Sequence, residues 1–400
     1  MTQPTALKRS LSLTQLVLYG IGTTVGAGIY ALVGEIAGVS GYLAPWAFLM
    51  AAALAAFTAF SYAQLSARYP QAAGAALYVQ QGLGHRRLAQ LVGLMVVLAG
   101  VVSSAALLNG FVGYLQEFTD INRGTIIIVA GVLLGGIALW GITESVWIAG
   151  IVSVVEVLGL LWVTALASQA ADFASVDLQR LVPEFAIGDW SLVFGGAVLA
   201  FYAYIGFEDM VEVAEEVRDV ESNLPRAIML TLILSSVIYI ALVCSTIVAV
   251  GPERLAQSTA PLADVYRYLT GAEPTAISVI GLFAIINGAL IQVIMASRVL
   301  YGLACRGQLP RIFARVNRHT KTPVPATLAT AGMVTTLALT GTLAGLAELT
   351  SVTMLCIFAL VNLSLYRLLR GDRPLHALLA LAGAVICAGV AGRAAYSWMA

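Results

Sequence analysis

The chain has 400 residues, of which 60% are hydrophobic and only 10% are charged, and its formal net charge is zero. About a quarter of the residues in a soluble domain are charged, so this composition excludes an ordinary soluble protein. It also leaves no net positive charge for nucleic acid. The four cysteines are scattered and form no C-x-x-C pair. We therefore expect no disulfide framework, no metal site and no cofactor.

Apolar segments of about 20 residues, the thickness of a bilayer core, recur along the chain. They are too long for barrel strands and do not alternate with period two, so an all-α integral membrane protein is predicted. The first segment lacks a small-residue cleavage site and is interpreted as a retained helix rather than a signal peptide. Eleven spanning helices are predicted, at 14–34, 42–67, 88–116, 124–141, 145–168, 190–211, 225–250, 274–304, 323–341, 346–369 and 375–398.

The Lys and Arg residues predict the orientation of these helices, because cytoplasmic loops carry the excess of positive charge. With a cytoplasmic N-terminus beginning at Lys8 and Arg9, sixteen of the 21 Lys and Arg residues lie inside. The compact loops predict that the protein is located in the plasma membrane of a prokaryote. The outer connections 169–189 and 251–273 are long enough for short interfacial helices. The five positive residues predicted outside are Arg123, Arg180, Arg254, Arg267 and Arg393.

The first span contains the stretch "YGIGTTVGAGIY", with four glycines in a helix that crosses a membrane. Each glycine costs about 1 kcal/mol relative to alanine in a helix interior. The spacing does not match the G-x-G-x-x-G of a dinucleotide site. Two interpretations remain. Gly22 and Gly26 form a pair that lets helices pack closely, or the helix breaks and exposes backbone groups to a polar cavity.

The sixth span, "GGAVLAFYAYIGFEDMVEVAEEV", supplies a second interruption at Ile205 and Gly206. Paired interruptions in two halves of a chain are typical of transporters built from inverted repeats. The first and sixth spans each open a block of five helices. A five-plus-five inverted repeat is therefore predicted within a single transporter domain, with repeats at 14–168 and 190–369 and an extra helix at 375–398.

Four stretches resemble permeases of the amino acid–polyamine–organocation superfamily, close to its cationic amino acid transporter branch. They are Gly26-Ala27-Gly28-Ile29, "FYAYIGFED" continued by "AEEVRDVESNLPRAI", "ASRVLYGLACRGQLP" and "ELTSVTMLCIFALVNLSLYRL". The resemblance covers most of the chain. It implies the leucine-transporter type of fold, with substrate held between broken helices 1 and 6. Many members have twelve helices, whereas eleven are predicted here.

A break in the first helix would place free amides at the positive end of a helix dipole, which is a site for an α-carboxylate. The carbonyls freed in the sixth helix would accept hydrogen bonds from an α-ammonium group. The residues predicted to bind the carboxylate are Thr24, Val25, Gly26, Ala27 and Gly28, and those predicted to bind the ammonium group are Tyr202, Ala203 and Ile205.

Polar side chains in the middle of the third and eighth spans are candidates for substrate specificity. Ser103 and Asn287 are predicted to contact substrate, with Ser104 and Gln292 beside them. Each could instead hydrogen-bond another helix. None of these side chains is charged, which favours a neutral substrate.

The remaining candidates are gating residues. Phe201 and Tyr204 are predicted to gate the site, although both could be core aromatics. Glu215 and Arg298 are predicted to form an inner gate pair, although a solvated loop would carry the same charges.

Ionisable residues within the membrane are expensive and usually functional. Glu156 lies at the centre of the fifth span, where loss of water disfavours the ionised form, so it is hypothesised to carry a coupling proton. A structural hydrogen bond is the alternative. The resemblance aligns it with a fifth-helix position near a vestigial cation site, where relatives have lysine or asparagine. Glu208 could couple protonation to gating or cap the half-helix.

Together these features predict a secondary active transporter of amino acids that works as a proton-coupled symporter by alternating access. The expected partners are an amino acid, protons and the lipid bilayer. An exchanger of amino acids or amines without ion coupling is the alternative, and sodium coupling is less favoured. An enzyme is not expected, because no H-E-x-x-H, G-x-S-x-G or phosphate loop occurs. A channel would need a continuous pore.

Overall fold

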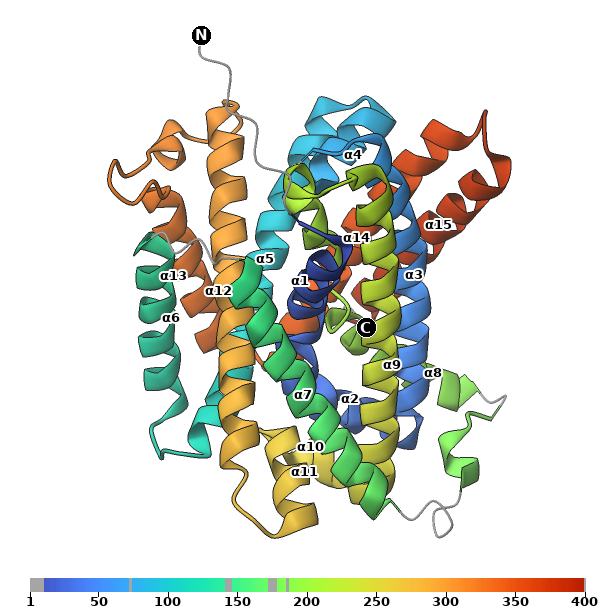
Figure 1. The fold of residues 1–400 in the computed structure, drawn as a ribbon, viewed down its shortest axis with the longest axis vertical. Helices are drawn as coiled ribbons and strands as arrows, with labels where there is room; N and C mark the ends of the chain where they lie inside the picture. Colours follow the sequence, from blue (N-terminus) through green and yellow to red (C-terminus); the bar gives the residue numbers. More distant parts are fainter. Residues whose placement is uncertain (1–10, 72–73, 141–145, 172–177, 185–186, 399–400) are drawn as a thin grey trace.

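A computed structural model describes residues 11–71, 74–140, 146–171, 178–184 and 187–398, and these form helices without a single strand (Figure 1). Nine helical segments of the described residues are long and apolar enough to cross a membrane, and Leu13–Val25 and Val324–Thr340 are shorter apolar helices. The predicted all-α membrane fold is confirmed. Lys8, Arg9 and the predicted limits 141 and 145 lie outside the described residues.

The long uninterrupted helices, together with the shorter α13, agree with the prediction to within a few residues at most ends. They are α3 (Ala44–Arg68), α5 (Arg86–Gln116), α6 (Arg123–Trp140), α7 (Val146–Ala170), α9 (Val220–Val250), α12 (Thr275–Cys305), α13 (Val324–Thr340), α14 (Leu343–Leu369) and α15 (Pro374–Ser397). Short elements connect them: η1 (Gly41–Leu43), α4 (Gly74–Leu83), η2 (Leu178–Leu181), α10 (Pro252–Gln257), α11 (Pro261–Thr270) and η4 (Arg311–Ala314).

The first span is broken at Gly26, whose ψ of −96° leaves the helical region between α1 (Leu13–Val25) and α2 (Ala27–Ser40). The sixth span is also broken. Helix α8 (Ile187–Tyr202) ends in a turn and continues as the 3₁₀ helix η3 (Phe207–Glu216). The predicted sixth helix, 190–211, therefore stops being α-helical nine residues early. Both interruptions are confirmed, while the inverted repeat remains a prediction.

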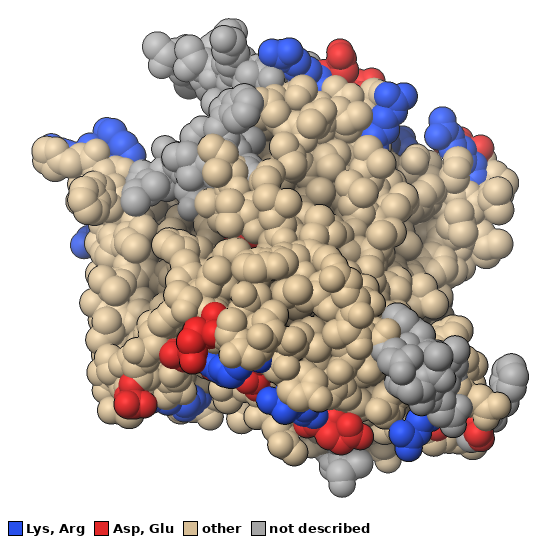
Figure 2. Space-filling model, turned by 60° about the horizontal axis from the view of Figure 1, so that its bottom comes forward, with Lys and Arg blue, Asp and Glu red and all other residues tan. Residues whose placement is uncertain are grey.

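The broken segments lie inside a bundle of longer helices. Helix α5 packs along α12, α3 along α9 and α14 along α15, and Figure 1 shows α1 near the middle of the bundle. Figure 2 shows most of the visible charged side chains toward two ends of the molecule, with a broad uncharged band between them. This distribution fits a protein embedded in a bilayer.

The connection between α9 and α12 contains the two short helices expected for 251–273. Arg267 on α11 pairs with Glu117 at the end of α5 and, at 3.1 Å, with Asp264. The hydrogen bond to Glu117 raises the pKa of Arg267. The ring of Tyr266 packs edge-on against Trp162 of α7, with 5.2 Å between the centroids. Helix α11 is thus attached to two spanning helices.

Candidate functional site

The two interruptions meet inside the bundle. The Thr23 hydroxyl donates a 3.0 Å hydrogen bond to the Gly206 carbonyl, which joins segments 183 residues apart. Gly206 has a φ of +129°, a conformation that favours glycine, and a Cβ atom there would lie 2.2 Å from the Thr23 carbonyl oxygen. A Cβ atom on Gly28 would lie 2.9 Å from the Cα of Ala203. Glycine at both positions therefore allows the two chains to approach.

Tyr239 of α9 also connects the same two segments. Its hydroxyl lies 2.8 Å from the carbonyl oxygens of both Thr24 and Ala203. The side chain is fully buried and packs edge-on against the rings of Tyr204 and Phe48. Because a hydroxyl has one proton, Tyr239 shares or alternates its donation between the two carbonyls. The sequence analysis missed this residue, since an aromatic in an apolar span looks like ordinary core.

Helix α2 begins at the break with no side chain capping its N-terminus. Its first amides belong to Ala27, Gly28 and Ile29, at the positive end of a 14-residue helix. Such an end favours an anion. Val25 closes α1 with a fully buried side chain, so it contributes only backbone here. The side chain of Ala27 is outside the described residues.

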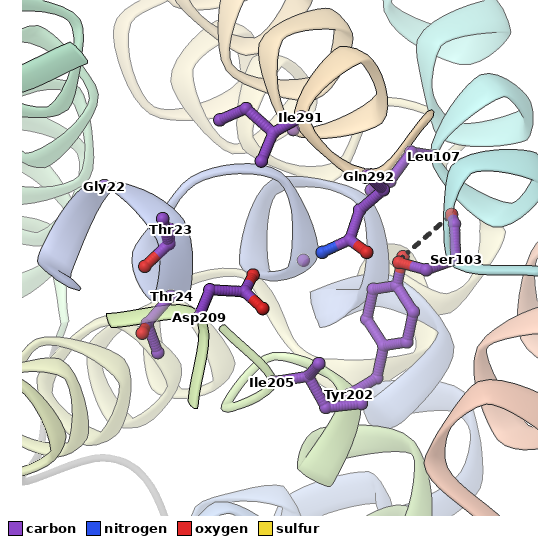
Figure 3. Close-up of a pocket in the computed structure, with 12 residues that line it drawn as sticks. Gly22, Thr23, Thr24, Ser103, Leu107, Tyr202, Ile205, Asp209, Ile291 and Gln292 are labelled. Carbon is purple, nitrogen blue, oxygen red and sulfur yellow. Dashed lines mark hydrogen bonds between the residues drawn. The ribbon is translucent and has the colours of Figure 1, made fainter. Parts of the chain in front are cut away.

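A cavity of about 40 Å³, roughly three times the room that one ordered water needs, opens where the breaks meet. Figure 3 shows side chains from α1, α5, η3 and α12 converging on it. Of the residues predicted to bind substrate, five line this cavity: Thr24, Gly28, Ser103, Tyr202 and Ile205.

Of the polar candidates on α5 and α12, Ser103 and Gln292 line the cavity, whereas Ser104 and Asn287 do not. Ser103 lines the cavity and its hydroxyl lies 2.8 Å from that of Tyr202. Ser104 instead donates to the Ala289 carbonyl at 2.6 Å, the interhelical alternative. Gln292 lines the cavity. Asn287 is outside the linings of both cavities described here.

Asp209 is the site residue that the sequence analysis did not single out. It lines the cavity with only 7% of its surface exposed, and its Oδ2 has no hydrogen-bond partner among the described residues. Its neighbour Glu208 behaves differently, because Glu208 Oε2 accepts a 2.9 Å hydrogen bond from the Gly206 amide. That contact fits the capping alternative for Glu208, and the coupling role of Glu208 remains a prediction. The Glu-Asp pair within a predicted span was the signal that could have identified Asp209.

A second cavity, also of about 40 Å³, leads away from the first toward the predicted cytoplasmic side. The two cavities share Ser103, Ile205, Asp209 and Gln292. The second extends to Gly74, where α4 begins, and contains Glu208 and the exposed Glu212. The two cavities are thus adjacent, and both are bordered by α5, η3 and α12.

Glu156 lies on the other side of the first break. Its side chain is 2% exposed, and a Cβ atom on Gly26 would lie 3.1 Å from its Oε2. The Tyr30 hydroxyl donates to the backbone carbonyl of Glu156 at 2.7 Å. Glu156 therefore borders the broken segment without lining either cavity.

The predicted gating residues lie outside the two cavities. Phe201 is buried against Phe358, with ring centroids 5.9 Å apart. Tyr204 is fully buried and its hydroxyl donates to the Phe48 carbonyl at 3.3 Å. Glu215 and Arg298 are both exposed, and the ion pairs found within the described residues all involve Arg267. The gating roles and the Glu215–Arg298 pair remain predictions.

Comparison with known proteins places this architecture among transporters. The amino acid permease family matches residues 11–399. An uncharacterized transporter of Mycobacterium tuberculosis is 32% identical over 394 residues, which cover 96% of this chain and 86% of that protein.

Two further relatives carry a substrate in their names. "Cationic amino acid transporter 2, vacuolar" of Arabidopsis thaliana is 31% identical over 387 residues, which cover 90% of this chain and 59% of that protein. "Cationic amino acid transporter 4" of Homo sapiens is 28% identical over 386 residues, which cover 91% of this chain and 60% of that protein. The chain thus spans about three-fifths of the length of these two relatives.

Proposed function

This chain belongs to the amino acid permease family, and on that premise we propose that it carries amino acids across a membrane by alternating access. The observation that carries the proposal is the meeting of two interrupted helices at a cavity in the middle of the bundle. Broken helices in the membrane interior typically hold substrate in secondary transporters.

The common part of an amino acid fits this arrangement. Its α-carboxylate would lie on the amides that begin α2, beside Gly28. Its α-ammonium group would donate to carbonyls of the turn between α8 and η3, at Ala203 and Ile205. The Ala203 carbonyl already accepts from Tyr239, but a carbonyl oxygen has two lone pairs and retains room for a second donor. Both contacts are made by backbone, so they suit many amino acids.

We also propose that a proton gradient drives uptake and that Glu156 carries the coupled proton. Burial of a carboxylic acid this deep in a membrane protein is energetically costly, and residues of this kind are usually functional. Because Glu156 packs against Gly26, a change in its charge would act on the segment whose amides bind substrate.

An exchanger that needs no ion is the second candidate. The names of the relatives add cationic amino acids as the substrate class, and we propose the cell membrane as the location.

Uptake by purified protein in liposomes would test this function. A pool of labelled L-amino acids would be offered under an inward proton gradient, under a sodium gradient and under neither, with protein-free liposomes as the control. Accumulation driven by protons alone would support symport. Accumulation only after preloading with amino acid would establish exchange and remove the coupling role of Glu156. Absence of transport under every condition would contradict the function itself.

A further inference from the structure

The first cavity contains a single charged side chain among the 12 residues that line it, and that side chain is Asp209. Figure 3 shows its carboxylate directed into the space between Thr23, Gln292 and Tyr202. The residue is buried, and its Oδ2 has no hydrogen-bond partner among the described residues. A side chain that served only to stabilise the fold would have its polar atoms satisfied.

No cation of the described residues balances this carboxylate. The ion pairs they contain are those of Arg267, on α11 near the predicted outer side. Thr23 donates its hydroxyl proton elsewhere, to the carbonyls of Gly20 and Gly206. A buried charge without a partner is strongly unfavourable. Asp209 is therefore neutralised either by a proton or by a positive group that enters the cavity from outside the protein.

The α-ammonium group of a substrate already has acceptors in the turn between α8 and η3. A positive group directed at Asp209 is then a second one, carried by the substrate side chain. We infer that Asp209 is the specificity-determining residue of this transporter and that it selects amino acids whose side chain ends in an ammonium or guanidinium group. This inference rests on the proposed function and names the contact that would select the substrate class.

The surroundings of Asp209 suit a cation. The Tyr202 hydroxyl lies across the same space and offers a neutral oxygen atom as a further acceptor, while Gln292 of α12 turns its amide nitrogen toward Asp209 (Figure 3). Glu212 follows Asp209 by three residues in η3, and residues with that spacing lie above one another in a 3₁₀ helix. Since Glu212 is exposed in the second cavity, a cationic side chain that leaves Asp209 for the adjacent cavity meets a second carboxylate there.

The test compares uptake of labelled lysine and labelled leucine by liposomes containing wild-type protein, Asp209→Asn or Asp209→Glu. We expect Asp209→Asn to lower lysine uptake at least about tenfold, as loss of a buried charge partner does, while leucine uptake stays within about threefold. Asp209→Glu restores the carboxylate and should restore the preference for lysine. Glu253→Gln, at an exposed position in α10 that lines neither cavity, should leave the lysine-to-leucine ratio unchanged.

Five outcomes would overturn the inference. Equal loss of lysine and leucine uptake would mean that Asp209 binds the α-ammonium group. Unchanged uptake of both amino acids by Asp209→Asn would mean that Asp209 binds no substrate. Wild-type protein that transports only neutral amino acids would refute the inference and leave the proposed function standing, whereas wild-type protein that transports none would refute both. Thermal unfolding of purified Asp209→Asn would show that the variant is folded, and its affinity for lysine would then be measured by direct binding. A wild-type affinity of Asp209→Asn for lysine would also contradict the assignment.

Discussion

Gly28 of α2 and Ala203 of the turn after α8 approach so closely that a Cβ atom on Gly28 would lie 2.9 Å from the Cα of Ala203. The nearest atom of Tyr202 would lie 3.3 Å from the same Cβ. Because the obstacle is backbone, it cannot rotate away as a flexible side chain would. The distance between the two broken helices, and with it the shape of the cavity, depends on this glycine.

Gly28→Ala is therefore expected to disturb the site at a cost of about 1–3 kcal/mol, as overpacking does. Substrate affinity should fall about tenfold for each 1.4 kcal/mol of that cost. Equilibrium binding and initial uptake rates in liposomes would measure the loss. Gly136→Ala is the matched control, because Gly136 lies in a helix with nothing within 4 Å of the added Cβ. Equal effects of the two substitutions would disprove the importance of the close approach.

Tyr239→Phe would remove one hydroxyl and leave the carbonyls of Thr24 and Ala203 without their shared donor. Since these groups are buried, we expect a loss of about 1–3 kcal/mol in the free energy of unfolding. Uptake should also fall, because both broken segments lose the contact that joins them. Thermal unfolding in detergent, combined with uptake, measures the two effects. Tyr396→Phe, at a side chain that is 68% exposed, should change neither.

The fold could be predicted from the sequence because the bilayer restricts the choices. A spanning helix needs about 20 apolar residues, and a break at membrane depth needs residues that tolerate it. The glycines from Gly20 to Gly28 met that requirement, although the packing interpretation was made for Gly22 and Gly26 and remains a prediction. Gly26 breaks the helix, whereas a Cβ atom on Gly20 would lie 2.5 Å from Thr231 Oγ1, so Gly20 permits close packing against α9.

The site was harder to predict because it depends on which face of a helix meets a neighbour. Gly288, Ile291 and Gln292 line the cavity, whereas Asn287, which is four residues before Ile291 and therefore near the same helical face, does not. The choice between Glu208 and Asp209 has the same cause. Adjacent residues of η3 point in different directions, and only the packed structure shows which one enters the cavity.

Helix α11 offers a comparison between an ion pair and apolar packing. Arg267 pairs with Glu117, but its side chain is 39% exposed, and exposed pairs contribute about 0–1 kcal/mol. Leu262 on the same helix is fully buried, and loss of such a side chain costs about 2–5 kcal/mol. We therefore expect Leu262→Ala to lower the melting temperature in detergent far more than Arg267→Gln. A larger effect of Arg267→Gln, weakened by high salt, would show instead that charge holds α11 in place.

Glu156→Gln separates substrate binding from coupling. The amide keeps the size of the side chain and its place beside Gly26, but it cannot take up and release a proton at physiological pH. If Glu156 carries the coupling proton, substrate affinity should stay within about twofold, while accumulation driven by an inward proton gradient is lost, because the gradient then has no group through which to act. Affinity would be measured by equilibrium binding, and accumulation in liposomes with and without the gradient. Glu253→Gln, at an exposed position in α10, is the control. Proton-driven accumulation that survives in Glu156→Gln would assign Glu156 a structural hydrogen bond.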